Sequence, residues 1–214
     1  MNMILQMRCR LADLRGRGVY AGWPNENQAI FIHLPKTAGT SISKALGLPT
    51  SRHVPAEDYL VSNPNKFARF FKFAFVRNPY DRLLSSYTFL RDGGMNPDDM
   101  KFSQAYVQPF ESFEHFLIDG FTRSPETRAW VHFRPQITFI CDARGSNQMD
   151  FTGRFESIAE DYAQIAARLG KPGELPVVNR SSRGDYREAY TPVMIDIVQR
   201  FYAADLETFG YGFD

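Results

Sequence analysis

Cysteine is scarce in this chain, and so are long hydrophobic runs and any excess of charge of one sign. The 214 residues contain two cysteines, Cys9 and Cys141, with neither C-x-x-C spacing nor a Cys/His metal-ligand pattern. Two cysteines in a chain of this length argue against a disulfide framework. We therefore expect no disulfide scaffold and no metal site.

No segment approaches the about 20 consecutive apolar residues that a membrane-spanning helix needs. The N-terminal residues 1–14 are interrupted by charged side chains and lack the apolar segment of a signal peptide. The formal net charge is +1, which gives no overall bias toward nucleic acid. We expect a soluble, cytoplasmic protein with no membrane span and no nucleic-acid partner. One local basic cluster, which we interpret as solvated surface, consists of Arg8, Arg10, Arg15 and Arg17.

Short apolar segments alternate with helical patterns along the chain. Strands are predicted at 29–34, 70–76 and 137–141, where apolar residues run without a helical period. Apolar residues at helical spacing predict helices at 41–46, 79–90, 110–120, 155–169 and 192–206. This alternation predicts an α/β fold with a mainly parallel sheet.

The loop after the first predicted strand has the composition of an anion site. Residues 35–41 place one lysine, one glycine and three hydroxyl side chains directly before a helix. Backbone N–H groups and the helix dipole favour an anion at such a helix start, and Lys36 adds a full positive charge. The loop is not the G-x-x-x-x-G-K-[ST] loop of nucleoside triphosphatases, because Lys36 precedes Gly39 by three positions. A plain strand–turn–helix with a surface lysine is the alternative.

A second polar segment follows the second predicted strand. Arg77 comes directly after the strand, and Asn78-Pro79 is typical of a helix start. Ser85 follows eight residues after Arg77 on the predicted helix. The planar guanidinium group suits phosphate, so Arg77 and Ser85 form a second candidate phosphate site. The alternative for Arg77 is a salt bridge with Asp81 or Asp92.

Together, residues 35–41 and 76–87 resemble the two cofactor motifs of the sulfotransferases. The resemblance is greatest to the branch that sulfates carbohydrates, of the heparan 2-O- and chondroitin type, and to its small bacterial relatives. It implies a P-loop-like, three-layer α/β fold with a central, mainly parallel sheet flanked by helices. It extends from residue 28 to the C-terminus, so we expect one sulfotransferase domain at 28–214 after an N-terminal extension of residues 1–27.

The resemblance also implies a cofactor. These enzymes use 3′-phosphoadenosine 5′-phosphosulfate (PAPS) and release 3′-phosphoadenosine 5′-phosphate (PAP), and they need no metal. The residues implied to bind the phosphosulfate are Lys36, Thr37, Ala38, Gly39, Thr40 and Ser41. The 3′-phosphate is implied to bind Arg77 and Ser85. In similar enzymes a late loop closes over the nucleotide, which points to Ser181 and Arg183, with an exposed flexible loop as the alternative.

Sulfuryl transfer needs an aligned nucleophile, a stabilised leaving oxygen and a proton acceptor. We expect Lys36 to stabilise the leaving phosphate oxygen. His53 resembles in position the catalytic histidine of the carbohydrate 2-O- and 6-O-sulfotransferases, so we expect it to be the general base, with a structural role as the alternative. His33 lies within the first predicted strand, and we expect a structural role for it.

The segment 132–136 is implied by the resemblance to lie on the acceptor side. Its candidate substrate-binding residues are His132, Arg134 and Gln136. For His132, a structural histidine that bonds the backbone is an equal alternative.

The sequence thus predicts a sulfotransferase that moves a sulfuryl group from PAPS to a hydroxyl of a carbohydrate or another hydroxyl-bearing acceptor, by in-line displacement. One alternative is a kinase-like nucleotide-binding enzyme, against which the missing G-K-[ST] argues. The other is an inactive sulfotransferase-like module that binds a glycan or a nucleotide. Nothing in the pattern predicts an oligomeric state.

Overall fold

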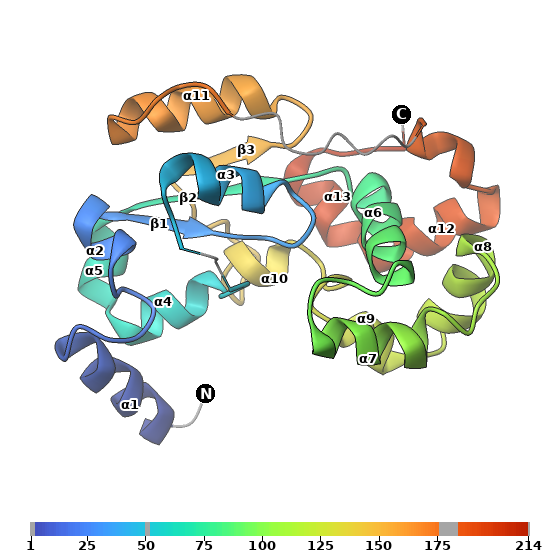
Figure 1. The fold of residues 1–214 in the computed structure, drawn as a ribbon, viewed down its shortest axis with the longest axis horizontal. Coiled ribbons are helices and arrows are strands. Elements are labelled where there is room, and N and C mark those ends of the chain that lie inside the picture. The colour runs from blue at the N-terminus through green and yellow to red at the C-terminus, as the bar shows by residue number, and fades with distance from the viewer. Residues whose placement is uncertain (1–2, 50–51, 176–183, 214) are drawn as a thin grey trace. The chain divides into compact units, whose positions relative to one another are not determined.

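The computed structural model describes residues 3–49, 52–175 and 184–213 (Figure 1). The chain forms two compact units, Met1–Val76 with Gln136–Val178 and Arg77–Pro135 with Asn179–Asp214. In the described part of the chain, no helix is long and apolar enough to cross a membrane.

A parallel sheet lies at the centre of the first unit, with its strands in the order β1-β2-β3. The strands are β1 (Ala29–Ile32), β2 (Phe71–Val76) and β3 (Phe151–Arg154). Every residue of β1 and β2 is buried, as expected for parallel strands that are covered on both faces. The register runs from Ala29 opposite Phe71 to Ile32 opposite Ala74. The first two strands therefore end at the same edge of the sheet, which is where ligands bind in parallel α/β sheets.

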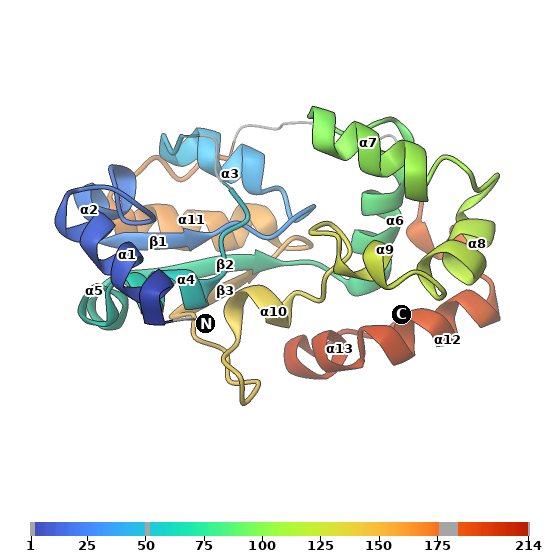
Figure 2. The same cartoon turned by 90° about the horizontal axis from the view of Figure 1, so that it is seen from below.

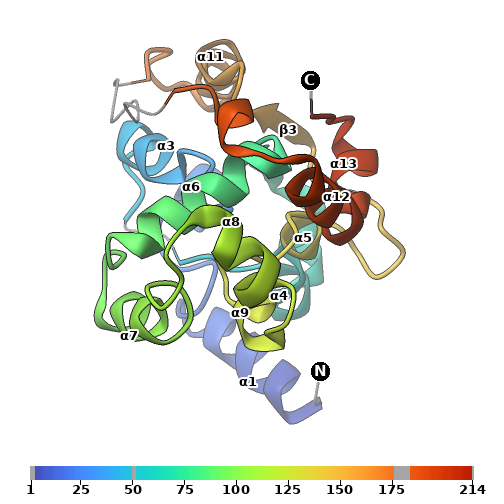
Figure 3. The same cartoon turned by 90° about the vertical axis from the view of Figure 1, so that its right-hand side faces the viewer.

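Helices cover both faces of this sheet. In Figure 3, α3 (Gly39–Leu46) and α11 (Ile158–Leu169) lie on one side and α4 (Ala56–Ser62) and α5 (Pro64–Arg69) on the other. On the first side the core consists mainly of Phe31, Ile42, Leu46, Phe73, Phe75, Tyr162 and Ile165. Figure 2 shows the same order, with α3 above the strands and α4 and α5 below them. These three layers confirm the predicted α/β fold.

The third strand is not where the sequence predicts it. Residues 137–141 do not form a strand, because Ile137–Ile140 is the short helix α10. A short apolar run without alternation fits a buried helix as well as a buried strand, and the preceding Gln136 already has the helical φ of −64°. The prediction of a strand at 137–141 is therefore wrong.

The strand beside β2 is instead β3, whose four residues, Phe-Thr-Gly-Arg, include the strand formers Phe and Thr but also a glycine, which strands disfavour. Its glycine is required by packing, because a Cβ on Gly153 would lie 2.6 Å from Cε1 of Phe75. Just before β3, the Asp150 carboxylate accepts hydrogen bonds from the backbone N–H and the Nζ of Lys72, at 2.7 and 2.8 Å. Contacts with β2 thus place this strand, rather than its own residue types.

Two further helices of the first unit precede the sheet, α1 (Met3–Leu14) and α2 (Trp23–Asn27). Neither has a counterpart among the predicted helices. Helix α1 packs against α4, and the buried Tyr20 that follows it donates a hydrogen bond from its hydroxyl to the Tyr59 carbonyl at 3.0 Å. Burial also raises the pKa of Tyr59 to about 12. This phenol therefore stays neutral around pH 7.

In its described residues, the second unit has helices joined by turns and loops, and no strand. It contains α6 (Pro79–Arg91), α7 (Pro97–Tyr106), α8 (Phe113–His115), the π-helix η1 (Phe116–Phe121), α9 (Pro125–Ala129), the 3₁₀ helix η2 (Tyr186–Ala189), α12 (Pro192–Phe201) and α13 (Ala203–Phe209). The predicted helices at 79–90 and 192–206 are present, the latter divided at Tyr202, and 110–120 is a short α-helix followed by the π-helix. Helix α7 was not predicted.

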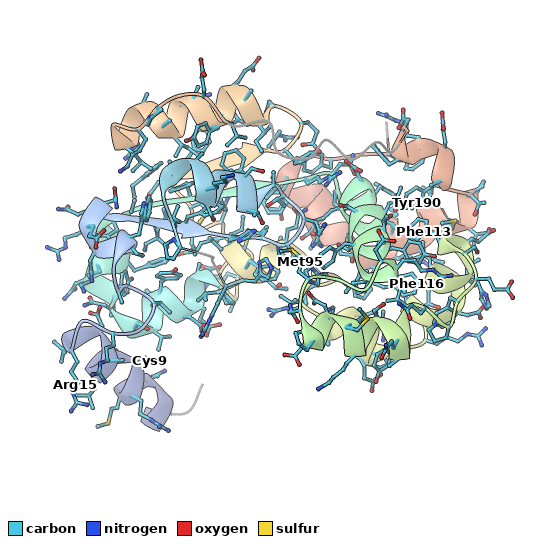
Figure 4. The ribbon with its side chains drawn as sticks, in the orientation of Figure 1. Cys9, Arg15, Met95, Phe113, Phe116 and Tyr190 are labelled. Carbon is cyan, nitrogen blue, oxygen red and sulfur yellow. The ribbon has the colours of Figure 1, made fainter. Side chains whose placement is uncertain are left out.

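Aromatic rings form much of the core of this unit. The Tyr87 ring lies 5.0 Å from Phe113 and 5.2 Å from Phe116, and Phe113 meets Tyr190 edge-on at 5.3 Å. Figure 4 labels Phe113, Phe116 and Tyr190, which gather beside α6 and α8. The Tyr190 hydroxyl donates to the Tyr80 carbonyl at 2.7 Å, which joins the first turn of α6 to the segment before α12.

Candidate functional site

The loop between β1 and α3 has a backbone conformation that its residue types disfavour. Lys36 and Ala38 have φ values of 65° and 62°, in the left-handed region. For a residue with a Cβ this costs about 1–2 kcal/mol, and such strain is concentrated at binding sites. Ala38 is also the N-cap of α3, where it offers no side-chain oxygen to the first N–H groups of the helix. The loop therefore provides α3 with a poor N-cap, but its conformation is suited to holding an anion.

The side chains of this loop differ in their exposure to solvent. Lys36 is half-buried and Thr40 is exposed, whereas Thr37 and Ser41 are buried. The Thr37 hydroxyl donates to the Leu34 carbonyl at 3.0 Å and so closes the loop on itself. In this arrangement Lys36 and Thr40 are the accessible polar side chains of the loop, and Thr37 supports its shape.

Gly39, the first residue of α3, lies against the ring of His33. A Cβ built on Gly39 would be 1.8 Å from Cδ2 of His33, a distance that no structure tolerates without movement. The His33 side chain is buried and its ring is nearly parallel to that of Phe31, with centroids 5.7 Å apart. The His33 ring therefore packs directly against the first residue of α3, and only glycine at position 39 leaves room for it.

His53 also contacts His33. Its Nδ1 is 2.8 Å from the carbonyl oxygen of His33, and the two rings meet at a centroid distance of 4.6 Å. A carbonyl oxygen can only accept, so Nδ1 of His53 carries the proton and donates it. In the neutral ring the lone pair is then on Nε2, as a general base requires. The contacts from Gly39 through His33 to His53 bring the predicted base next to the predicted anion loop.

Replacing Gly39 by alanine is expected to destabilise the protein by about 1–3 kcal/mol, the usual cost of overpacking. The added methyl group must displace the His33 ring, which also packs edge-on against the ring of His53. Gly173→Ala is the matched control, because nothing lies within 4 Å of a Cβ at Gly173, and it should stay within about 0.5 kcal/mol of wild type. Urea unfolding measures both, and equal stability of the two variants would contradict this packing.

The second predicted phosphate site begins the second unit, at the residue that follows β2. The Arg77 guanidinium is buried, and its Nε and Nη2 lie 2.7 and 2.6 Å from Oδ2 of Asp81. The salt bridge that the sequence offered as an alternative is thus present. It orients the guanidinium without using up its five N–H donors. Asn78 caps α6 as predicted by accepting from the Tyr80 N–H at 3.1 Å, and Ser85 lies buried in that helix.

The predicted acceptor-side segment is held by a residue that the sequence did not single out as functional. Arg82 is almost fully buried, and its guanidinium donates to the carbonyl groups of His132 and Arg134 at 3.2 and 2.6 Å. His132 is buried with its Nε2 3.3 Å from Oδ1 of Asp99. The partner is thus a carboxylate and not the backbone group that the structural alternative for His132 expects.

The remaining predicted site residues are placed as follows. Arg134 is partly exposed, whereas Gln136, in the first unit, is fully buried at the start of α10. Ser181 and Arg183 lie outside the described residues. Among the residues that the structure describes, no group of three or more His, Cys, Asp or Glu side chains is arranged to hold a metal ion.

A parallel sheet whose first strand leads into a strained, lysine-bearing loop and a helix N-terminus defines an α/β protein with a candidate site for an anionic group. A family model described as the sulfotransferase family matches residues 24–212. The chain therefore belongs to the sulfotransferase family, and sulfuryl transfer is its class of reaction. No curated protein and no solved structure matches the chain significantly.

Proposed function

We propose that this sulfotransferase moves a sulfuryl group from PAPS to a hydroxyl of a carbohydrate, with His53 as the general base. The observation that carries the proposal is the set of contacts in the first unit. A half-buried lysine, a strained loop at a helix N-terminus and a histidine whose Nδ1 donates to a carbonyl occur within one cluster. Each of these features suits one requirement of the reaction.

The residues of the loop fit a phosphosulfate group. Left-handed residues such as Lys36 and Ala38 are typical of loops whose backbone N–H groups form an anion-binding concavity, and the N-terminus of α3 would add its dipole. When bound, PAPS supplies a sulfuryl group on a phosphate leaving group. The Lys36 ammonium would stabilise the charge that develops on the leaving oxygen. Thr40, whose side chain is exposed, would add a hydroxyl donor.

The 3′-phosphate of the nucleotide requires donors of its own. We propose that Arg77 and Ser85 bind the 3′-phosphate, as the resemblance implies. The Asp81 carboxylate supports this role, because it holds the guanidinium in one orientation at 2.6–2.7 Å. An oriented guanidinium loses less conformational entropy when it binds phosphate.

The tautomer of His53 supports the base assignment, which rests on the resemblance. An acceptor hydroxyl must lose its proton as its oxygen bonds to sulfur, and Nε2 is the ring atom that can take it. The hydrogen bond from Nδ1 to the His33 carbonyl holds the ring in place. The carbohydrate acceptor rests on the family resemblance. Of the three proposed acceptor-binding residues, Arg134 has the accessible side chain.

Calorimetry with PAP and with Mg²⁺-ATP tests the proposal. We expect PAP to bind at least tenfold more tightly than ATP, because the proposed site holds two separate anionic groups and the loop lacks G-K-[ST]. The purified protein should then transfer labelled sulfate from PAPS to members of a glycan panel. Tighter binding of Mg²⁺-ATP would support the kinase-like alternative. Tight PAP binding with no transfer to any acceptor would support the inactive module.

A further inference from the structure

Helix α1 presents an apolar stripe to solvent. Met7, Leu11 and Leu14 are 59%, 45% and 81% exposed. Their spacing of four and three residues places them on one face of the helix. The family match begins at residue 24, so α1 lies outside the matched range. Sulfuryl transfer therefore does not account for this stripe.

The opposite face of α1 is fastened to the first unit. Asp13 has a buried carboxylate that accepts hydrogen bonds from Nδ2 of Asn63 and Nζ of Lys66, both at 2.7 Å. At about 100° per residue, Asp13 lies about 160° from Leu11 and about 100° from Leu14, so it is off the apolar stripe. The ion pair between Asp13 and Lys66 thus attaches one face of α1 to the rest of the first unit, and the apolar stripe faces solvent.

Arginines border the stripe on both sides. Arg8 and Arg15 are seven residues apart and share one flank, and Arg10 lies on the other flank. All three are exposed, as is Arg17, and Figure 4 labels the Arg15 side chain, which directly follows α1. The acidic residue of this segment, Asp13, is already paired with Lys66. The exposed charge of residues 6–17 is therefore entirely positive.

We propose that α1 binds an anionic lipid surface, with the apolar stripe in the headgroup boundary and the arginines against lipid phosphates. An apolar stripe between basic residues is the pattern of helices that lie in a membrane interface, and anionic headgroups attract such residues. A symmetric contact with a second copy would bring the same four arginines together, and like charges disfavour it. Charge complementarity thus selects a lipid surface over self-association.

Co-sedimentation with vesicles tests this proposal. The full chain should bind vesicles of phosphatidylglycerol and phosphatidylcholine at least tenfold more tightly than vesicles of phosphatidylcholine alone, and added salt should weaken the binding. Two double variants, Leu11→Ser with Leu14→Ser and Arg8→Gln with Arg15→Gln, should each reduce binding to the anionic vesicles at least tenfold.

Matched controls are available on other elements. Val193 on α12 is 56% exposed, and Arg144 is exposed in the loop before β3. Val193→Ser and Arg144→Gln should bind the anionic vesicles like wild type. Equal binding to both kinds of vesicle, or equal losses in the controls, would overturn the proposal. It would also fail if sedimentation equilibrium showed a dimer that the Leu11/Leu14 variant abolished.

Discussion

Replacing Lys36 by alanine should weaken PAP binding by about ten- to a hundredfold, since a hydrogen bond to a charged group is worth about 1.5–3 kcal/mol. The rate of sulfuryl transfer should fall further, by about 10²–10³, the usual cost of removing a group that stabilises transition-state charge. Calorimetry and initial rates measure the two effects separately. Lys44→Ala is the matched control, because Lys44 is an exposed lysine later in α3, and it should change neither.

A second substitution at position 36 separates the effect on cofactor binding from the effect on the stability of the fold. Lys36→Gly relieves the left-handed strain at φ 65°, a gain of about 1–2 kcal/mol. The greater freedom of glycine in the unfolded chain offsets about 0.5–1 kcal/mol of that gain. The glycine variant should therefore be at least as stable as wild type in urea and yet lose binding as the alanine variant does. Full binding by Lys36→Gly would remove Lys36 from the cofactor site.

Replacing His53 by alanine should reduce the turnover rate by about 10²–10⁴, the usual contribution of a general base, and leave PAP affinity within twofold of wild type. The reason is that Nε2 of His53 is proposed to act on the acceptor proton and not on the nucleotide. Single-turnover kinetics and calorimetry measure the two effects. His115→Ala is the control, because His115 lies in the second unit and its side chain is 47% exposed.

His53→Asn distinguishes the base from a positioning role. The asparagine Nδ2 takes the place of Nδ1, so it keeps an N–H donor for the His33 carbonyl and removes Nε2. We expect this variant to be as stable as wild type and as slow as His53→Ala, without the acidic limb that a histidine base gives the turnover profile. Recovery of turnover in His53→Asn would mean that His53 acts by holding the loop, and another residue would then be the base.

The features that the sequence predicted well are those encoded by neighbouring residues. The buried run 29–34, the Asn78-Pro79 helix start and the glycine after α11 each gave an element close to its observed place. Gly170, for example, ends α11 in the left-handed conformation that glycine favours. The run 137–141 failed because a short apolar segment fits either a strand or a helix, and only packing decides between them.

The residues of the candidate site also fall into those that local sequence predicts and those that it does not. Lys36, Gly39 and Arg77 were recognisable because they follow strand ends within a few residues. By contrast, no local pattern shows that Arg82 holds the carbonyl groups of residues 132 and 134, about 50 residues later in the chain. Nor does a local pattern reveal that Asp99 pairs with His132. Both contacts depend on how α6 and α7 pack.

The sequence by itself determined the first two strands, the anion loop and the sulfotransferase resemblance, because each is carried by a contiguous run of residues. Tertiary structure alone decided that a Cβ at position 39 would strike the His33 ring and that the His33 carbonyl sets the tautomer of His53. It also decided that Asp13 docks α1 and leaves its apolar stripe exposed. The physical reason is that these contacts join residues 6 to 53 positions apart, and chain folding, not local propensity, brings such residues within 3 Å.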